Sequence, residues 1–246
     1  MIHIENLTKS YGSLTAVSDL NLSIPAGECF GFLGPNGAGK TTTIKLLAGL
    51  LKPNKGTIEI CGYNIQLDPQ RVKSIIGYIP DKPFIYEKLT GGEFLDFIAD
   101  LYQVNGTFVK NKREELLNLF SIKDFEHELV EGYSHGMKQK LVITAALIHN
   151  PRVIIIDEPM VGLDPKGMRQ VKEIFKELTK NGVTVFMSTH TMSIAQEMCH
   201  RIGIIQKGKL IVLGTMDELQ RQARVSSGLE DVFLQLTSET HSKQIT

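Results

Sequence analysis

The sequence predicts an α/β fold built around a mostly parallel sheet. Three short runs of residues hydrophobic on both faces, each followed by a helical pattern, cover residues 29–33, 153–156 and 184–187. Strands buried on both faces are typical of the centre of a parallel sheet. A helix with its apolar residues on one stripe is predicted to begin at Pro165 and to end before Gly182.

Two other regions interrupt this alternation. Residues 2–7, 14–24 and 56–62 alternate apolar and polar residues, which predicts an antiparallel β-lobe. The region from about 82 to 148 has helical periodicity, and Thr90 with Glu93 forms a capping box before Phe94. We therefore expect a core with β-lobe (about 1–81 and 149–214), a helical lobe (about 82–148), and a C-terminal helical segment with a polar, frayed tail (215–246).

Composition excludes several function classes. Lys plus Arg and Asp plus Glu each total 27, so no overall basic field favours nucleic acid. The three cysteines lack metal or redox spacing, which fits a reducing compartment. The first residues do not resemble a secretory signal, and the longest aliphatic runs are far short of the roughly 20 residues of a membrane helix. Any membrane role is therefore expected through a partner.

A phosphate-binding loop is the strongest local signal. Gly34 to Thr41 matches G-x-x-x-x-G-K-[ST] between the predicted strand at 29–33 and a helical pattern over 42–50. Glycines let backbone N–H groups surround phosphates, Lys40 supplies a positive charge, and Thr41 supplies a hydroxyl for Mg²⁺. The ATP-binding residues predicted from this loop are Gly34, Pro35, Asn36, Gly37, Ala38, Gly39, Lys40, Thr41 and Thr42. The motif predicts a P-loop NTPase (RecA-like) core.

A pair of carboxylates follows the strand at 153–156. Asp157 and Glu158 are adjacent there, and a charge at the end of a buried strand usually faces a site. One carboxylate can hold Mg²⁺ through water, and the next can orient and deprotonate an attacking water. We assign the first role to Asp157 and the second to Glu158.

Together with this loop and carboxylate pair, three further blocks resemble one family, the ATP-binding-cassette (ABC) ATPases. Residues 133–140 (YSHGMKQK) are similar to the family's signature motif, 162–165 (GLDP) to its D-loop, and 188–190 (STH) to its switch histidine. Tyr11, placed shortly after the first strand, is similar to the aromatic that stacks on adenine. The resemblance covers about residues 2–236 in the family's order.

The resemblance implies roles for these residues. Ser134 and Gly136 precede an apolar helical stretch, so a hydroxyl, an N–H and a helix dipole point towards an anion together. By resemblance, Ser134, His135 and Gly136 complete the ATP site of a second copy, so that two chains enclose two ATP molecules head to tail. Asp164 belongs to the D-loop, and His190 is expected to donate to the γ-phosphate.

Three positions depart from the family pattern. His135 stands where the family usually has glycine, and Met137 stands where it usually has glutamine. Asp81 replaces the usual glutamine at the hinge between core and helical lobe, where we expect it to approach Mg²⁺, through water, only in a closed dimer. Exporter-type members resemble this sequence at these places, which favours export over import by analogy.

The sequence therefore predicts the ATP-hydrolysing subunit of an exporter, with Mg²⁺ as cofactor. Its partners would be a second copy or a paralogous cassette and a separate transmembrane permease, with the chain peripheral on the cytoplasmic face of the membrane. A soluble cassette acting on a cytoplasmic assembly is the alternative. A kinase or other phosphate-loop enzyme would leave Ser134, Asp164 and His190 without a purpose.

Overall fold

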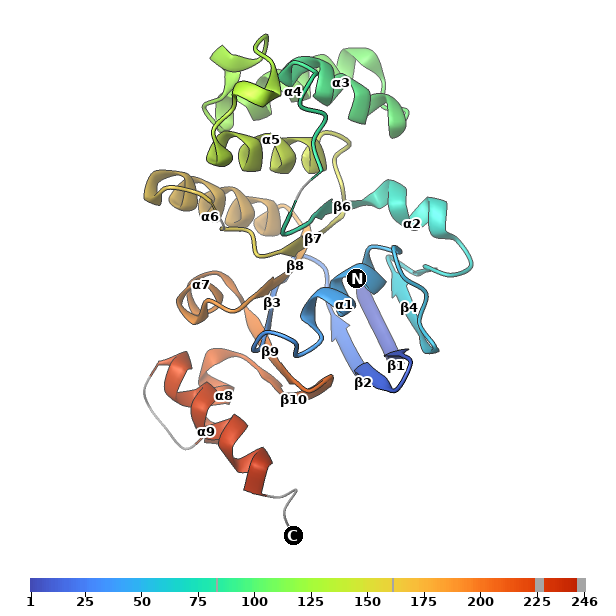
Figure 1. Ribbon diagram of the computed structural model, residues 1–246, viewed down its shortest axis with the longest axis vertical. Helices are drawn as coiled ribbons and strands as arrows, with labels where there is room; N and C mark the ends of the chain where they lie inside the picture. The colour runs from blue at the N-terminus through green and yellow to red at the C-terminus, as the bar shows by residue number, and fades with distance from the viewer. Residues whose placement is uncertain (83, 161, 224–227, 243–246) are drawn as a thin grey trace.

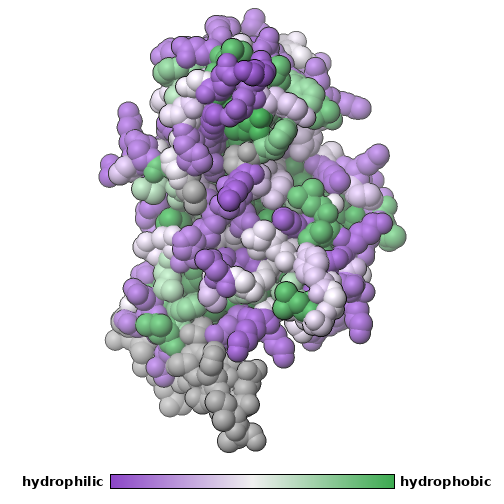
Figure 2. Space-filling model, in the orientation of Figure 1, coloured by the Kyte–Doolittle hydropathy of each residue, from purple (hydrophilic) through white to green (hydrophobic). Residues whose placement is uncertain are grey.

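The computed structural model describes residues 1–82, 84–160, 162–223 and 228–242, with the backbone alone for 236–242. Figure 1 shows three helices (α3, α4 and α5) at one end, the sheets in the middle, and α8 and α9 at the other end. On the face shown in Figure 2, hydrophobic residues form separate patches among polar ones. Within the described residues, no helix has both the length and the apolar character needed to cross a membrane.

A six-stranded sheet forms the centre, in the order β10-β9-β3-β8-β7-β6. All neighbouring pairs are parallel except β10 with β9, so the predicted mostly parallel sheet is confirmed. The strands are β3 (Cys29–Leu33), β6 (Ile76–Ile79), β7 (Val153–Asp157), β8 (Thr184–Thr189), β9 (Arg201–Gln206) and β10 (Lys209–Gly214). β3, β7 and β8 are buried along their whole length, which explains their continuous apolar sequences.

The order of these strands determines where the candidate site residues lie. β8 pairs with β3 on one side and with β7 on the other, and β7 pairs with β6. In register, Leu33 lies opposite Thr189, and Asp157 lies opposite Ser188. Because parallel strands end at the same edge of a sheet, the residues that follow β3, β8, β7 and β6 are neighbours there.

The β-lobe is a four-stranded antiparallel sheet in the order β2-β1-β4-β5. Its strands are β1 (Ile2–Tyr11), β2 (Leu14–Ile24), β4 (Lys55–Ile60) and β5 (Tyr63–Asn64). β1 is longer than predicted, since register shifts in its pairing with β2 let it continue past residue 7. Tyr11 is consequently the last residue of β1, and its expected position after the first strand is wrong.

Three helices form the helical lobe: α3 (Gly91–Leu101), α4 (Gly106–Leu119) and α5 (His135–Leu147). The capping box predicted at Thr90 and Glu93 is present, with both reciprocal hydrogen bonds. Phe94 and Leu95 are buried, whereas Phe97 and Leu101 on the same helix are exposed. The apolar residues of α3 therefore exceed what the lobe's own core covers. Two short 3-10 helices, η1 (Lys123–Phe125) and η2 (Val130–Gly132), precede α5.

The remaining helices lie against the sheets. They are α1 (Lys40–Leu47), α2 (Pro69–Ile75), α6 (Pro165–Lys180), α7 (Met192–Met198), α8 (Met216–Ala223) and α9 (Leu229–Ser242). The helix expected over 42–50 begins two residues earlier and ends at Leu47, where Gly49 adopts a positive φ of 66°. In Figure 1, α6 lies between the helical lobe and the sheet.

The polar tail does not fray where the sequence suggested. The backbone of α9 stays helical through Ser242, and residues 243–246 lie outside the described residues. Leu229 and Val232 are buried in one cluster with residues of α7 and α8, so the first turn of α9 is anchored. Once a first turn is formed, each residue added to the helix gains one hydrogen bond that offsets the entropy lost in fixing its backbone, even where the sequence is polar.

Candidate active site

The phosphate loop joins the carboxyl end of β3 to the start of α1. Gly39 precedes α1 with φ 112°, a conformation that side chains rarely adopt. A Cβ atom at Gly39 would also lie 2.3 Å from the carbonyl oxygen of Ala16. Both facts explain why residue 39 is a glycine. Without a side chain there, the backbone can come close to a phosphate bound in the loop.

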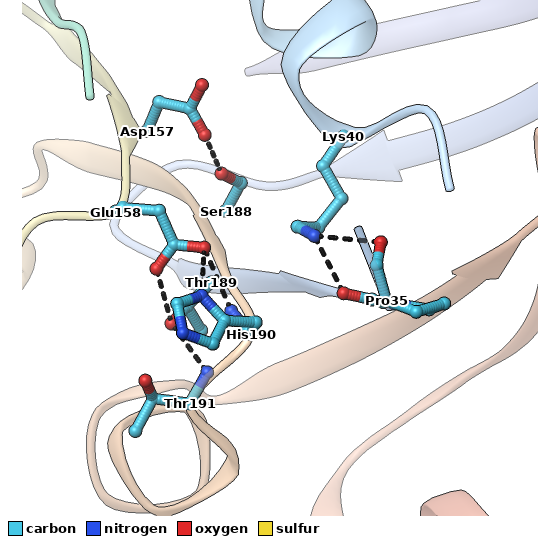
Figure 3. Close-up of polar contacts among 9 residues, drawn as sticks. Pro35, Lys40, Asp157, Glu158, Ser188, Thr189, His190 and Thr191 are labelled. Atoms are coloured by element: carbon cyan, nitrogen blue, oxygen red, sulfur yellow. Dashed lines mark hydrogen bonds and ion pairs between the residues drawn. The ribbon is translucent and has the colours of Figure 1, made fainter. Parts of the chain in front are cut away.

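Lys40 is buried and its ammonium group closes the loop from within. Its Nζ donates to the carbonyl oxygens of Gly34 (2.7 Å) and Pro35 (3.1 Å), as Figure 3 shows for Pro35. Burial lowers the pKa of Lys40 below its ordinary value, while the carboxylates of Glu158 and Asp157 act in the opposite direction. The ammonium therefore lies within the electrostatic reach of both carboxylates, where phosphates would gain most from it.

Asp157 and Glu158, at the end of β7, form different hydrogen bonds with residues at the end of β8. Asp157 is buried and accepts a hydrogen bond from the hydroxyl of Ser188 on β8. The Glu158 carboxylate lies 2.7 Å from Nδ1 of His190 and accepts the His190 backbone N–H at 3.0 Å. The hydroxyl of Thr189 donates to the second Glu158 oxygen at 3.2 Å. Figure 3 shows these residues facing the Lys40 ammonium across the sheet edge.

The backbone of Glu158 is unusual as well. Its φ is 54°, which is uncommon for a residue with a side chain, and its N–H donates to the Ser188 carbonyl at 3.1 Å. Such conformations persist only where surrounding contacts impose them, and they gather at active sites. Here the contacts are those of β8 and of the residues just after it.

A hollow of about 270 Å³ lies beside the phosphate loop. Its lining combines the loop with the end of β1 and the start of β2: Tyr11, Leu14, Ala16, Asn36, Gly37, Gly39, Lys40, Thr41 and Thr42. Tyr11 is about half exposed, and its ring lies 5.3 Å below the Lys9 ammonium. The structure thus brings an exposed aromatic next to a phosphate-binding backbone.

The proposed signature residues lie elsewhere. Ser134 is the N-cap of α5, its hydroxyl accepting the Met137 N–H at 3.3 Å, and Gly136 follows in the first turn. His135 and Asp81 line a different groove of about 640 Å³, between the segment after β6 and the start of α5. This hinge groove is lined by Asp81, Lys82, Phe84, Ile85, Tyr86, Glu87, Lys88, His135, Lys138 and Gln139. It shares no residue with the hollow beside the phosphate loop.

Volume alone would point to another place. A cavity of about 990 Å³ lies between α4, the end of α6 and the start of β7. None of the predicted site residues lines it. The chemistry of the phosphate loop, and not cavity size, therefore identifies the candidate active site.

Known proteins support this assignment. Residues 17–161 match the protein family described as ABC transporter. The linearmycin resistance ATP-binding protein LnrL of Bacillus subtilis (strain 168) is 35% identical over 254 residues, covering 100% of this chain and 82% of LnrL. The chain belongs to the ABC transporter family. It is an ATP-binding, ATP-hydrolysing subunit of the kind that powers transporters.

Further comparisons extend the likeness to structure. The bacitracin transport ATP-binding protein BcrA of Bacillus licheniformis is 39% identical over 225 residues, covering 91% of this ABC subunit and 72% of BcrA. A solved ATP-binding subunit of an ABC transporter superposes with a TM-score of 0.92 at 32% identity, over 96% of this chain and 99% of that one. A dimeric cassette in a post-hydrolysis state with ADP and phosphate gives a TM-score of 0.80 at 26% identity, over 88% and 99%.

Two neighbours of the Asp157–Glu158 carboxylate pair were not predicted as site residues from sequence. Ser188 and Thr189 bond Asp157 and Glu158 respectively, although only His190 of that block was assigned a role. The signal was available, since both are polar residues at the end of an apolar strand. Leu14, which lines the hollow beside Tyr11, gave no signal of its own.

Proposed function

We propose that this ABC subunit drives an exporter, acting as a head-to-tail dimer on a separate membrane-spanning subunit. One observation carries the proposal. Within one chain, Ser134 and Gly136 lie at the start of α5 and do not line the hollow beside the phosphate loop. A helix start with free N–H groups and a hydroxyl attracts phosphate, yet here it serves no phosphate loop of its own. A second copy, related by a two-fold axis, supplies that loop.

The export direction is supported by relatives. LnrL carries linearmycin resistance in its name and BcrA carries bacitracin transport. ATP-driven accumulation of a labelled compound in inside-out vesicles holding the chain and its membrane subunit would test export. Accumulation in right-side-out vesicles instead would indicate import. A chain that remains in the supernatant when the membrane subunit is produced would favour the soluble alternative.

The residues present fit Mg²⁺. Thr41 offers a hydroxyl beside the phosphate loop, and Asp157 offers a carboxylate at the neighbouring strand end. Oxygen donors of this kind, completed by substrate phosphates and water, are how proteins usually hold Mg²⁺. The described residues contain no cluster of three or more His, Cys, Asp or Glu able to hold a metal without ATP. When bound, the ion would neutralise phosphate charge.

The chain's own groups then divide the remaining work. The Lys40 ammonium holds the terminal phosphates, and Tyr11 supports the adenine. Glu158 orients and deprotonates the attacking water, because it follows β7 at the same sheet edge as the phosphate loop. His190, bonded to Glu158 through Nδ1, keeps its other ring nitrogen for the γ-phosphate. Asp164 caps α6 by accepting the Gly167 N–H at 2.9 Å, which fixes the D-loop.

The hinge groove supplies a docking surface for the membrane subunit. From sequence, the aromatics of segment 83–86 fit either ordinary core or an exposed groove, and the structure excludes the core interpretation for Phe84 (82% exposed) and Tyr86 (47% exposed). Their rings pack edge to face at 5.4 Å, and Tyr86 packs on exposed Phe97 at 5.3 Å. Pro83, the first residue of segment 83–86, lies outside the described residues. An exposed aromatic cluster beside a groove fits an apolar helix of a partner.

Charged substitutions at this cluster are expected to separate assembly from hydrolysis. Phe84→Asp and Tyr86→Asp remove exposed apolar surface, so folding and basal ATP hydrolysis should persist while co-purification with the membrane subunit is lost. Leu67→Asp, at an equally exposed leucine outside the groove, is the matched control. Retained assembly in both groove variants would assign the docking surface elsewhere.

Asp81 should act in coupling rather than in ATP binding. It lines the hinge groove and not the hollow beside the phosphate loop. Burial raises the pKa of Tyr78, and the carboxylates of Asp157 and Asp81 raise it further, so Asp81 already lies near the catalytic edge. A closing movement of the helical lobe would bring Asp81 towards the metal, where a carboxylate can only accept hydrogen bonds.

We expect Asp81→Asn to keep ATP binding and to reduce the stimulation of hydrolysis by the membrane subunit. Hydrolysis would be measured with and without that subunit, beside the wild type. Equal stimulation in the wild type, Asp81→Asn and Asp81→Ala would show that Asp81 is a simple loop residue.

A further inference from the structure

His135 occupies a position that the family pattern gives to glycine, and its ring has a specific partner. A Cβ atom at Gly162 would lie 1.8 Å from Cδ2 and 2.2 Å from Nε2 of His135. The imidazole therefore lies directly on the backbone of Gly162. A Cβ at Gly136 would in turn lie 3.3 Å from the Gly162 carbonyl oxygen, so two consecutive residues of α5 contact Gly162.

Gly162 connects the catalytic carboxylate to α6. On the side towards Glu158, Met160 is buried two residues beyond that carboxylate, and its carbonyl accepts the N–H of buried Leu163 at 3.4 Å. On the other side, Asp164 caps α6. Gly162 is therefore held within a turn that begins two residues after Glu158 and leads into α6.

The other side of His135 faces the hinge groove. Lys138, one turn further along α5, forms an ion pair with Glu87 at 2.5 Å, and both residues line that groove. The first turn of α5 thus has Ser134 at its cap, Gly162 against His135, and the groove along one face. His135 therefore lies where the N-cap of α5, the loop at Gly162 and the hinge groove come together.

We propose that His135 is a positioning residue: its imidazole, lying on Gly162, holds the loop after Glu158 in register with the start of α5 of the same chain. The proposal deepens the proposed dimer function, because Ser134 serves the facing ATP while Glu158 serves the chain's own. The contact makes the two half-sites of one chain move together. It also connects an occupant of the hinge groove to the catalytic carboxylate.

The first test is a double-mutant cycle in kcat for ATP hydrolysis by the purified chain. His135→Ala removes the ring, and Gly162→Ala displaces it, so each should lower kcat about tenfold, the order expected for slight misplacement of a catalytic group. Because both remove one contact, the double variant should fall no further than the lower single variant. A double variant about a hundredfold down, the product of both effects, would overturn the proposal.

Two controls separate the contact from general damage. Gly62 has φ 82°, nearly that of Gly162 (80°), but a Cβ there would meet nothing within 4 Å. Gly62→Ala therefore introduces the same backbone strain without a clash and should keep wild-type kcat. His127→Ala removes an exposed histidine of the helical lobe and should also leave kcat unchanged.

A second readout distinguishes positioning from a merely structural role. In His135→Ala the dissociation constant for ATP should stay within about twofold of wild type while kcat falls, because the phosphate loop is untouched. His135→Phe restores a planar ring on Gly162 and should recover most of kcat. An unchanged kcat in His135→Ala, or no recovery with phenylalanine, would contradict the proposal. Loss of hydrolysis in Glu158→Gln tests the catalytic assignment separately, whichever way the cycle turns out.

Discussion

Replacing Glu158 with glutamine should lower kcat for ATP hydrolysis by about 10²–10⁴ while ATP stays bound. Glutamine keeps the shape of the side chain and removes its ability to take a proton. The Glu158 carboxylate is held by His190 and Thr189 at the sheet edge that also carries the phosphate loop, where the attacking water would lie. Steady-state hydrolysis and equilibrium nucleotide binding, measured on the same preparation, check both halves of this expectation.

Lys40→Ala is the matched comparison, because it removes a buried cation whose phosphate contacts serve binding. ATP binding should be weakened in Lys40→Ala and kept in Glu158→Gln. If Glu158→Gln hydrolysed ATP at nearly the wild-type rate, the general base would lie elsewhere. A Glu158→Gln protein that failed to bind ATP would instead show that this carboxylate supports the loop around Lys40.

The sheet edge that gathers the candidate site residues could be predicted because buried strands of a parallel sheet follow from simple patterns. Three buried strands are recognisable from their nearly continuous apolar sequences, and each is followed by candidate site residues. These are the phosphate loop after β3, Asp157 and Glu158 at the end of β7, and His190 after β8. Once the strands are parallel neighbours, their ends must meet. The contacts of Ser188 and Thr189 depend on register between strands, which local pattern does not fix.

The aromatic segment 83–86 indicated an exposed groove as one of two alternatives, but the part that α5 plays in lining the hinge groove and the His135 contact could not be predicted, for a different reason. Both depend on how α5 packs against segments that are distant in sequence. The amphipathic pattern of a helix predicts which face is buried, but it does not predict which element packs on that face. Phe97 and Leu101 illustrate the limit, since their helical spacing resembles core positions although they are exposed. Only the structure shows that the core of the helical lobe is packed without these two side chains, so that α3 carries more apolar surface than the lobe buries.

The second large expected effect is on the oligomeric state of the chain. Glu158→Gln should be a monomer without nucleotide and a dimer with Mg-ATP, because ATP that cannot be hydrolysed continues to join the two half-sites. Ser134 is exposed at the start of α5, where the facing phosphate would meet a hydroxyl and free N–H groups. Light scattering after size exclusion would measure the mass with and without nucleotide.

Adding Ser134→Arg to Glu158→Gln should abolish this dimer, although arginine is itself a phosphate ligand. The long side chain would occupy the volume where the facing ATP must approach, and it replaces the N-cap that accepts the Met137 N–H. Ser74→Arg, which adds the same charge to an exposed serine of α2, should leave dimerisation intact. Loss of the dimer in both arginine variants would indicate a general effect of charge. A constant mass under every condition would mean that isolated chains do not enclose ATP between them, and that the membrane subunit is required to bring the two half-sites together.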